Sequence, residues 1–173
     1  NLGKSPALSF SVLGTQTEPL TINSASGTAG IRIKDFTVAS GAGPVTIGGI
    51  AGVDNINLGS TNVTAHAFTN NSANPVTFQS DVSFGAGNAV THNVTLGGSG
   101  DWNINASLEK SSQGTINVIK DGSGKLNLGQ AKSAGIAGFT ITSGTIANTS
   151  GATMTTLATN VSLNGDFAFA GSA

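Results

Sequence analysis

Hydrophobic and polar positions alternate along this chain in short triplets, each with an apolar residue at both ends and, in most, a polar residue between them. The outer members are mostly Val, Ile, Leu or Phe, and the middle member is mostly Thr, Ser or Asn. The triplets occupy residues 8–10, 20–22, 31–33, 36–38, 45–47, 56–58, 76–78, 82–84, 94–96, 102–104, 116–118, 126–128, 139–141, 161–163 and 167–169. Period-two alternation predicts short strands with one buried face and one solvated face.

The segments between the triplets are rich in Gly, Ser, Asn and Asp, which favour tight corners. Helical periodicity is nearly absent: only residues 105–113 would suit a turn or two of helix, and their Ser and Asn content argues against more. Strands that alternate with corners exclude a doubly wound α/β fold. Two all-β arrangements remain, a parallel β-solenoid and an antiparallel β-sandwich.

The spacing of equivalent residues favours the solenoid. Asp81, Asp101 and Asp121 fall 20 residues apart, and so do Val82 and Trp102. A fixed repeat of this length is typical of stacked coils. Elsewhere the repeat drifts between about 18 and 25 residues, as irregular corners would produce. We therefore expect coils of about 20 residues, some eight in all, that rise by ~4.8 Å each and stack their inward side chains in apolar columns.

The Asn164-Gly165 pair separates two of the alternating triplets. It would suit a two-residue hairpin, which favours the sandwich, or a corner in a coil. The corner is the preferred interpretation, because Asn and Gly both tolerate the left-handed conformation that such corners use. In the solenoid, Leu126 and Phe139 should point into the interior.

Composition fits one domain, or a segment of a longer repetitive chain, over residues 1–173. Charged residues make up 9% of the chain, against a usual share of roughly 25%, and the net charge is −1. The lysines and Arg32 are scattered, so no basic face for nucleic acid is expected. Weak charge also gives little self-repulsion, which permits association end to end or edge to edge.

The chain has no cysteine, so its stability is expected to come from packing and hydrogen bonds. No apolar run approaches the ~20 residues of a membrane helix, and we expect no membrane span. Residue 1 is Asn and no signal peptide follows, which indicates a processed product or an excerpt.

Residues 120–146 carry the most distinctive unit of the sequence. It reads as a lysine, a Gly-x-Gly, a Leu-x-Leu with a following Gly, a spacer, and then Gly-x-Thr-x-x-x-Gly-x-Ile. The unit resembles the autotransporter-associated β-strand repeat, also called the passenger-associated transport repeat. The matching positions are Lys120, Gly122, Gly124, Leu126, Leu128, Gly129, Gly138, Thr140, Gly144 and Ile146. The spacer at residues 130–137 departs from the family because it lacks an Asn-x-Tyr element, and Ile146 replaces a leucine.

This resemblance covers about a sixth of the chain. The rest of the chain is similar to the family only in its general sequence character and does not match the motif. It implies a right-handed parallel β-helix within a large exported bacterial surface protein. Members of the family serve as stalks, adhesins or secretion-assisting segments, and the repeat carries no catalytic residues. The resemblance therefore implies an extracellular or cell-surface location.

The residues that could act in catalysis show no arrangement typical of an active site. Cleavage of polysaccharides requires paired carboxylates, but the eight acidic residues are single and dispersed. We expect no enzyme activity and no cofactor. If the 20-residue register holds, Asp81, Asp101 and Asp121 would stack into a carboxylate ladder able to bind Ca²⁺. The preferred interpretation is that these residues begin strands or cap corners.

His66 and His92 lie 26 residues apart in alternating segments. A metal site would need further ligands beside them, so we predict that both lie on the solvated face of strands. Trp102 is predicted to anchor the core or a corner and not to serve as a sugar platform.

The sequence therefore predicts a noncatalytic extracellular structural protein: a β-solenoid stalk, an adhesin segment or a self-assembling surface filament subunit. Residues 1–14 and 166–173 show no charged or helical cap, so we expect end-to-end self-association or continuation within a longer chain. A cell-surface glycan or protein is the other partner considered. The alternative function is a carbohydrate-binding or carbohydrate-cleaving β-helix, with exposed aromatic or acidic residues of successive coils converging on one groove.

Overall fold

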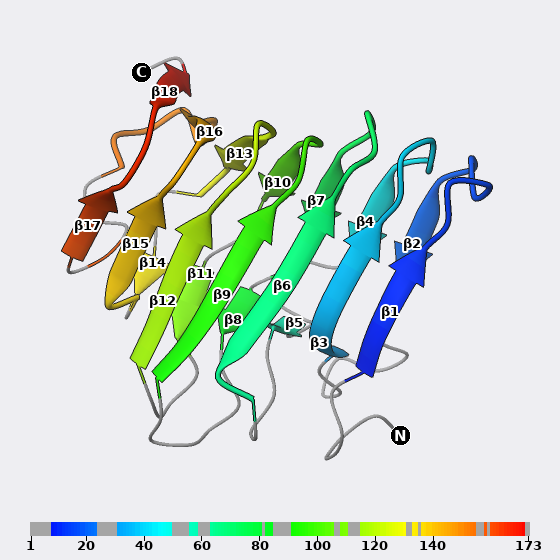
Figure 1. Ribbon diagram of the computed structural model, residues 1–173, viewed down its shortest axis with the longest axis horizontal. Coiled ribbons are helices and arrows are strands. Elements are labelled where there is room, and N and C mark those ends of the chain that lie inside the picture. The colour runs from blue at the N-terminus through cyan, green and yellow to red at the C-terminus, as the bar shows by residue number, and fades with distance from the viewer. Residues whose placement is uncertain are drawn as a thin grey trace.

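The computed structural model describes residues 8–23, 31–49, 56–58, 63–80, 82–84, 91–105, 108–110, 115–130, 133–134, 136–154, 158 and 160–171. These ranges contain strands and corners and no helix, and they stack in coils as a β-solenoid of about five turns (Figure 1). Every pairing between described strands is parallel. The predicted solenoid is confirmed, and the antiparallel sandwich is excluded.

The strands form an 11-stranded sheet, called sheet A, and a seven-stranded sheet, called sheet B. The long front of sheet A consists of β1 (Leu8–Val12), β3 (Ile31–Val38), β6 (Ala65–Asn70), β9 (Thr91–Gly97), β12 (Thr115–Lys120), β15 (Gly138–Ile141) and β17 (Asn160–Leu163). Its flank consists of β5 (Ile56–Leu58), β8 (Val82–Phe84), β11 (Leu108–Lys110) and β14 (Ser133–Ala134). Sheet B consists of β2 (Leu20–Ile22), β4 (Val45–Ile47), β7 (Val76–Phe78), β10 (Trp102–Ile104), β13 (Lys125–Leu128), β16 (Gly144–Asn148) and β18 (Phe167–Gly171).

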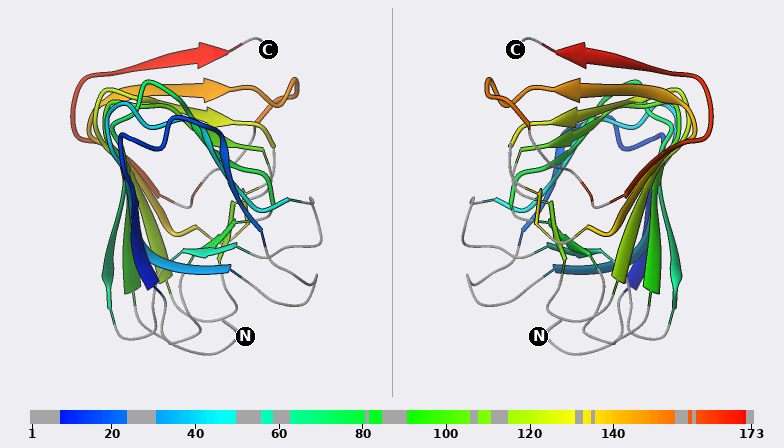
Figure 2. Two further views of the ribbon diagram at one scale, coloured as in Figure 1. Left: turned by 90° about the vertical axis from the view of Figure 1, so that its right-hand side faces the viewer. Right: turned by 90° about the vertical axis from the view of Figure 1, so that its left-hand side faces the viewer.

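Strand β3 joins the front of sheet A to its flank. Residues 31–33 pair with β5, whereas residues 36–38 pair with β1 and β6. Viewed from the N-terminal end, the coils that have a described flank strand run up the front, across sheet B and back along the flank (Figure 2, left). The path turns clockwise as it recedes toward the C-terminus, so the solenoid is right-handed.

The coils are longer than predicted, about 24 residues instead of 20. Hydrogen bonds between coils join Asn93 to Asn117, 24 residues apart, and Asp35 to Ala67, 32 residues apart. Coil length varies because the corners differ in length while the strands keep their register. The described part of the chain makes about five turns, fewer than the eight predicted.

The interior consists of columns of inward side chains from strands that lie side by side in the two sheets. In sheet A, Phe36 aligns with Phe68, Phe68 with Leu96, and all three are buried. Leu126 and Phe139 are also buried, as predicted. Full burial of one such side chain stabilises the fold by about 1.5–3 kcal/mol, so the columns provide the main stabilising contribution.

Trp102 is fully buried in the core between the sheets. Its ring stacks on Phe78 with 5.8 Å between centroids, and its Nε1–H donates to the carbonyl oxygen of Gly97 at 3.0 Å. A buried indole needs such an acceptor for its N–H group. The prediction that Trp102 anchors the core is confirmed.

The corner between sheets A and B requires glycine where successive coils touch. Gly98 and Gly122 both have positive φ, at 99° and 78°. A Cβ at Gly122 would overlap the carbonyl oxygen of Gly98 in the preceding coil. Glycine therefore allows both the left-handed turn and the close stacking of corners.

Asn164-Gly165 forms such a corner and not a hairpin. Strand β17 before it pairs in parallel with β15, and strand β18 after it pairs in parallel with β16. The prediction of a corner is confirmed.

Candidate functional site

The last coil, formed by β17 and β18, exposes the apolar side chains that other coils bury. Val161, Leu163 and Phe169 are 56%, 58% and 73% exposed. In the described part of the chain, β17 pairs only with β15 and β18 only with β16, so each strand has one free edge (Figure 1). We call this surface the open last coil.

The exposed side chains of the open last coil occupy interior positions. Leu163 aligns with the buried Ile141, and Phe169 aligns with the buried Ile146. Their side chains therefore continue the core columns to a point where no described coil covers them. A free strand edge also presents unpaired N–H and C=O groups, so this surface combines apolar contact with backbone hydrogen bonding.

The first coil, formed by β1 and β2, lies at the opposite end of both sheets (Figure 1). Its inward residues Phe10, Leu20 and Ile22 are only half-buried, although they pack against the core. The two ends of the described solenoid thus present edges of the same two sheets.

The acidic candidates form hydrogen bonds between coils. Asp101 Oδ1 accepts the backbone N–H of Lys125 at 2.8 Å. Asp121 Oδ1 accepts the Thr142 hydroxyl at 2.7 Å, and this hydrogen bond is the main cause of a lowered pKa for Asp121. Both carboxylates therefore connect a corner to the next coil.

The predicted carboxylate ladder rested on the 20-residue register, which is wrong. Because Trp102 aligns with Leu126, Asp101 lies beside Lys125 and not beside Asp121. Asp81 lies outside the described residues. No group of three or more His, Asp or Glu residues in the described ranges is placed to hold a metal ion.

The prediction that His66 and His92 lie on the solvated face is wrong. They are 2% and 0% exposed, because they occupy inward positions of β6 and β9. His66 aligns with Val94, and His92 aligns with Ile116. The rings stack with 5.6 Å between centroids, and His66 Nε2 lies 3.4 Å from His92 Nδ1.

The backbone carbonyl groups around the two imidazoles define their hydrogen bonding. His66 Nδ1 lies 3.2 Å from the carbonyl oxygen of Lys34, and His92 Nδ1 lies 3.1 Å from that of Val63. Neutral rings with a proton on each Nδ1 satisfy both carbonyl groups. His92 Nε2 is buried and has no hydrogen-bond partner within the described structure.

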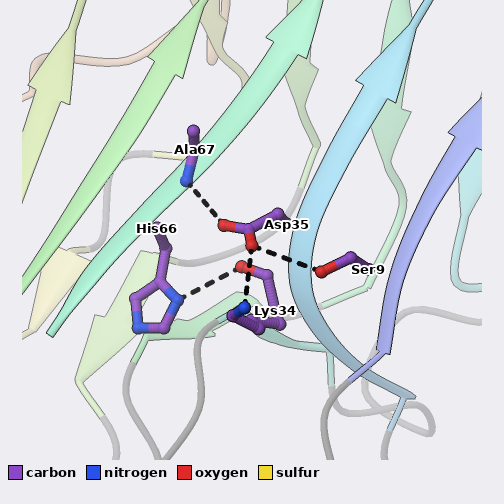
Figure 3. A network of polar contacts seen from close by, with 5 residues as sticks. All are labelled: Ser9, Lys34, Asp35, His66 and Ala67. Atoms are coloured by element: carbon purple, nitrogen blue, oxygen red, sulfur yellow. Dashed lines mark hydrogen bonds and ion pairs between the residues drawn. The ribbon is translucent and has the colours of Figure 1, made fainter. Parts of the chain in front are cut away.

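His66 and Asp35 support the point where β3 changes partner (Figure 3). Asp35 Oδ1 accepts the backbone N–H of Ala67 at 3.0 Å, and Asp35 Oδ2 accepts the Ser9 hydroxyl at 3.3 Å. Lys34 Nζ lies 3.5 Å from the same carboxylate. These side chains thus connect β1, β3 and β6 close to the point where the register of the β1–β3 pairing shifts.

Lys120, the first residue of the repeat-like unit, is fully buried at the end of β12. Its Nζ donates to the carbonyl oxygens of Asp121, Gly122 and Ser143 at 3.1, 2.7 and 3.2 Å. Burial lowers the pKa of Lys120. The lysine therefore closes the corner from inside, a role that the sequence alone did not reveal.

The other residues of the repeat-like unit have structural positions. Leu126, Leu128 and Ile146 are buried in sheet B. Thr140 points outward from β15, and Gly138 begins that strand. The glycines at corners or strand ends are Gly122, Gly124, Gly129 and Gly144.

A corner motif at Asn70 and Asn148 also went unpredicted. Asn70 Nδ2 donates to the Asn74 carbonyl oxygen at 3.0 Å, and its Oδ1 accepts the Ser72 N–H at 3.0 Å. Asn148 repeats both bonds with residues two and four positions further on. The shared sequence signal is Asn-x-Ser directly at the end of a strand.

Comparisons with family models, with curated proteins and with solved structures give no match to this chain. No helix in the described ranges has the length and apolarity needed to cross a bilayer.

Proposed function

We propose that this chain is a noncatalytic structural protein of the bacterial cell surface or extracellular space, a rigid β-solenoid segment of a stalk, adhesin or filament. The observation that carries the proposal is the open last coil. Among the described strands, two sheets end there with free edges and with Leu163 and Phe169 in interior positions. Such an end is suited to being covered by a further coil.

Other features support a structural role. The interior columns run from the first coil to the last, and each coil packs mainly on its neighbours, as in other solenoids. Asp101, Asp121 and Lys120 are engaged in hydrogen bonds at corners. The resemblance of residues 120–146 to autotransporter-associated repeats supports the proposed location and the use as a stalk or adhesin segment.

The carbohydrate alternative remains a prediction without a specific observation in its favour. It requires exposed aromatic or acidic residues that converge on one groove. Among the described side chains, the large exposed hydrophobic residues are Leu13, Val161, Leu163 and Phe169. Phe169 is the aromatic member of this set, and it belongs to the open last coil.

Sedimentation velocity over a wide concentration range tests the proposal. The unmodified chain should form elongated particles whose mass rises with concentration. Phe169→Lys should abolish this growth, because a charge would enter an interior column. Ala168→Lys is the matched control, since Ala168 is also exposed but points outward from β18. A strictly monomeric wild-type chain at all concentrations would contradict the assembly role.

A further inference from the structure

We infer that the partner of the open last coil is the first coil of a second copy of this chain, joined head to tail with the strand register continued. This inference rests on the proposed structural function and specifies the contact that would build a filament.

The direction of the strands selects the end that fits. Every described pairing is parallel, so a strand added to β17 or β18 in the same ladder must run in the same direction. Strands β1 and β2 meet this condition and belong to the same two sheets. Joining two last coils would instead make the new pairing antiparallel.

The interior columns define which residues would meet. Phe10 and Leu163 are the two ends of one column in sheet A, which runs through Phe36, Phe68, Leu96, Lys120 and Ile141. Leu20 and Phe169 are the two ends of one column in sheet B, which runs through Val45, Val76, Trp102, Leu126 and Ile146. Continued register places Leu163 against Phe10 of the second copy, and Phe169 against Leu20.

The terminal strands carry none of the charges that commonly protect sheet edges. Strands β1, β2, β17 and β18 contain no Lys, Arg, Asp or Glu. Natural edge strands are often protected by lysine or proline, which block pairing. Edges without these residues are compatible with pairing to another copy.

Among the described residues, the charges at the corner of this interface are acidic on both sides. Glu18 precedes β2, and Asp166 precedes β18. Stacked corners would bring these like charges toward each other, so assembly should strengthen as salt rises. Screening acts over about 10 Å at 0.1 M salt. Asp166→Asn should reduce this salt dependence.

Disulfide trapping tests the register directly, because the chain has no cysteine of its own. Neighbouring parallel strands are about 4.8 Å apart, within the ~4.4–6.8 Å range of Cα separations in disulfides. A Phe10→Cys, Leu163→Cys chain should form a ladder of covalent oligomers under mild oxidation. Phe10→Cys with Ser162→Cys is the control, since Ser162 points outward.

Leu20→Cys with Phe169→Cys provides a second pair in sheet B and should give the same ladder. If the wild-type chain assembles and Phe169→Lys does not, but neither cysteine pair forms a ladder, the head-to-tail register is wrong and the structural function stands. If the wild-type chain never assembles, the head-to-tail contact and the filament role are both wrong. A ladder from the Ser162 control equal to that from the Leu163 pair would also overturn the register.

Discussion

The last coil and the coil before it have the same alternating sequence pattern but opposite exposure. Phe139 and Ile141 in β15 are buried, whereas Val161 and Leu163, aligned with them in β17, are exposed. The difference does not arise from the residues themselves, because all four are apolar and point in the same direction. It arises because a further described coil covers β15 and none covers β17.

The two coils show that the direction of a side chain and its burial have different causes. Alternation determines the side to which a side chain points, while burial depends on the next coil. The interior of a solenoid is therefore completed one coil at a time. A substitution at equivalent positions should have very different effects in the two coils.

The largest effect is expected for a charge placed in the covered coil. Phe139→Asp should destabilise the fold by several kcal/mol, because it buries a carboxylate without a partner and leaves a cavity. Leu163→Asp should change the free energy of unfolding by less than about 0.5 kcal/mol, as at other exposed sites. Urea unfolding of dilute protein measures both.

Leu126→Asp in sheet B is the second variant of this kind and should behave like Phe139→Asp. Limited proteolysis gives an independent measurement. Full protease resistance of Phe139→Asp would mean that this side chain points outward, and the comparison would fail.

The next effect concerns the contact between stacked corners. Gly122 and Gly151 both have positive φ, at 78° and 71°, but a Cβ at Gly151 would meet nothing within 4 Å. Alanine at either position carries the cost of the left-handed backbone, about 1–2 kcal/mol. Gly122→Ala should cost at least ~1 kcal/mol more, because the new Cβ meets the Gly98 carbonyl oxygen.

Urea midpoints of the two glycine variants measure this difference. Equal losses of stability would show that corner stacking contributes nothing beyond backbone strain.

The buried histidines allow a comparison within two columns, since Val94 and Ile116 occupy the positions aligned with His66 and His92. Burial is the main cause of a lowered pKa for His66 in the fold. A base with a lowered folded pKa binds fewer protons than in the unfolded chain. Stability should therefore fall as pH drops below 6.5, by up to about 1.4 kcal/mol per pH unit for each proton.

A variant without the two histidines tests this expectation. The charged groups nearby are Lys34 and Asp35 of β3, and both remain in a His66→Val, His92→Ile variant. Urea unfolding at pH 7 and pH 5 should show a large loss for the wild type and a smaller one for the variant. Equal losses in the two proteins would mean that the histidines do not cause the acid sensitivity.

The smallest effect is expected for the amide ladders on the outer face. Asn117 Nδ2 donates to Asn93 Oδ1 at 3.0 Å in an exposed contact. Asn117→Ala should cost about 0.5–1 kcal/mol, since water replaces much of this bond. Thermal unfolding measures it, and a loss as large as that of Gly122→Ala would contradict the ranking.

The sequence predicted the strands and corners well because local chemistry determines both. Each apolar-polar-apolar triplet forms part of a strand, and Asn164-Gly165 forms a corner. The strand around His66, β6, was predicted, but its inward face was assigned wrongly, because its inward residues include His66 and Asn70 while Ala65 and Ala67 face solvent. Its polarity is thus the reverse of the triplet pattern.

Coil length and the interior positions of polar groups were harder to predict from the sequence. Coil length depends on how many residues each corner absorbs, which alternation does not reveal. The interior position of Lys120 depends on three carbonyl groups of two corners that meet only in the fold. The exposure of the open last coil could not be predicted either, because it depends on whether a further coil covers β17 and β18.

Hydrogen exchange of β17 and β18 in dilute and concentrated protein distinguishes an open last coil from one that a second copy covers. In dilute solution, the amides of residues 160–171 should exchange faster than those of residues 138–148. At high concentration, their protection should rise toward that of β15 and β16, because a second copy covers the free edges. Fast exchange of residues 160–171 at every concentration, or full protection in the most dilute sample, would contradict an open coil that is completed by assembly.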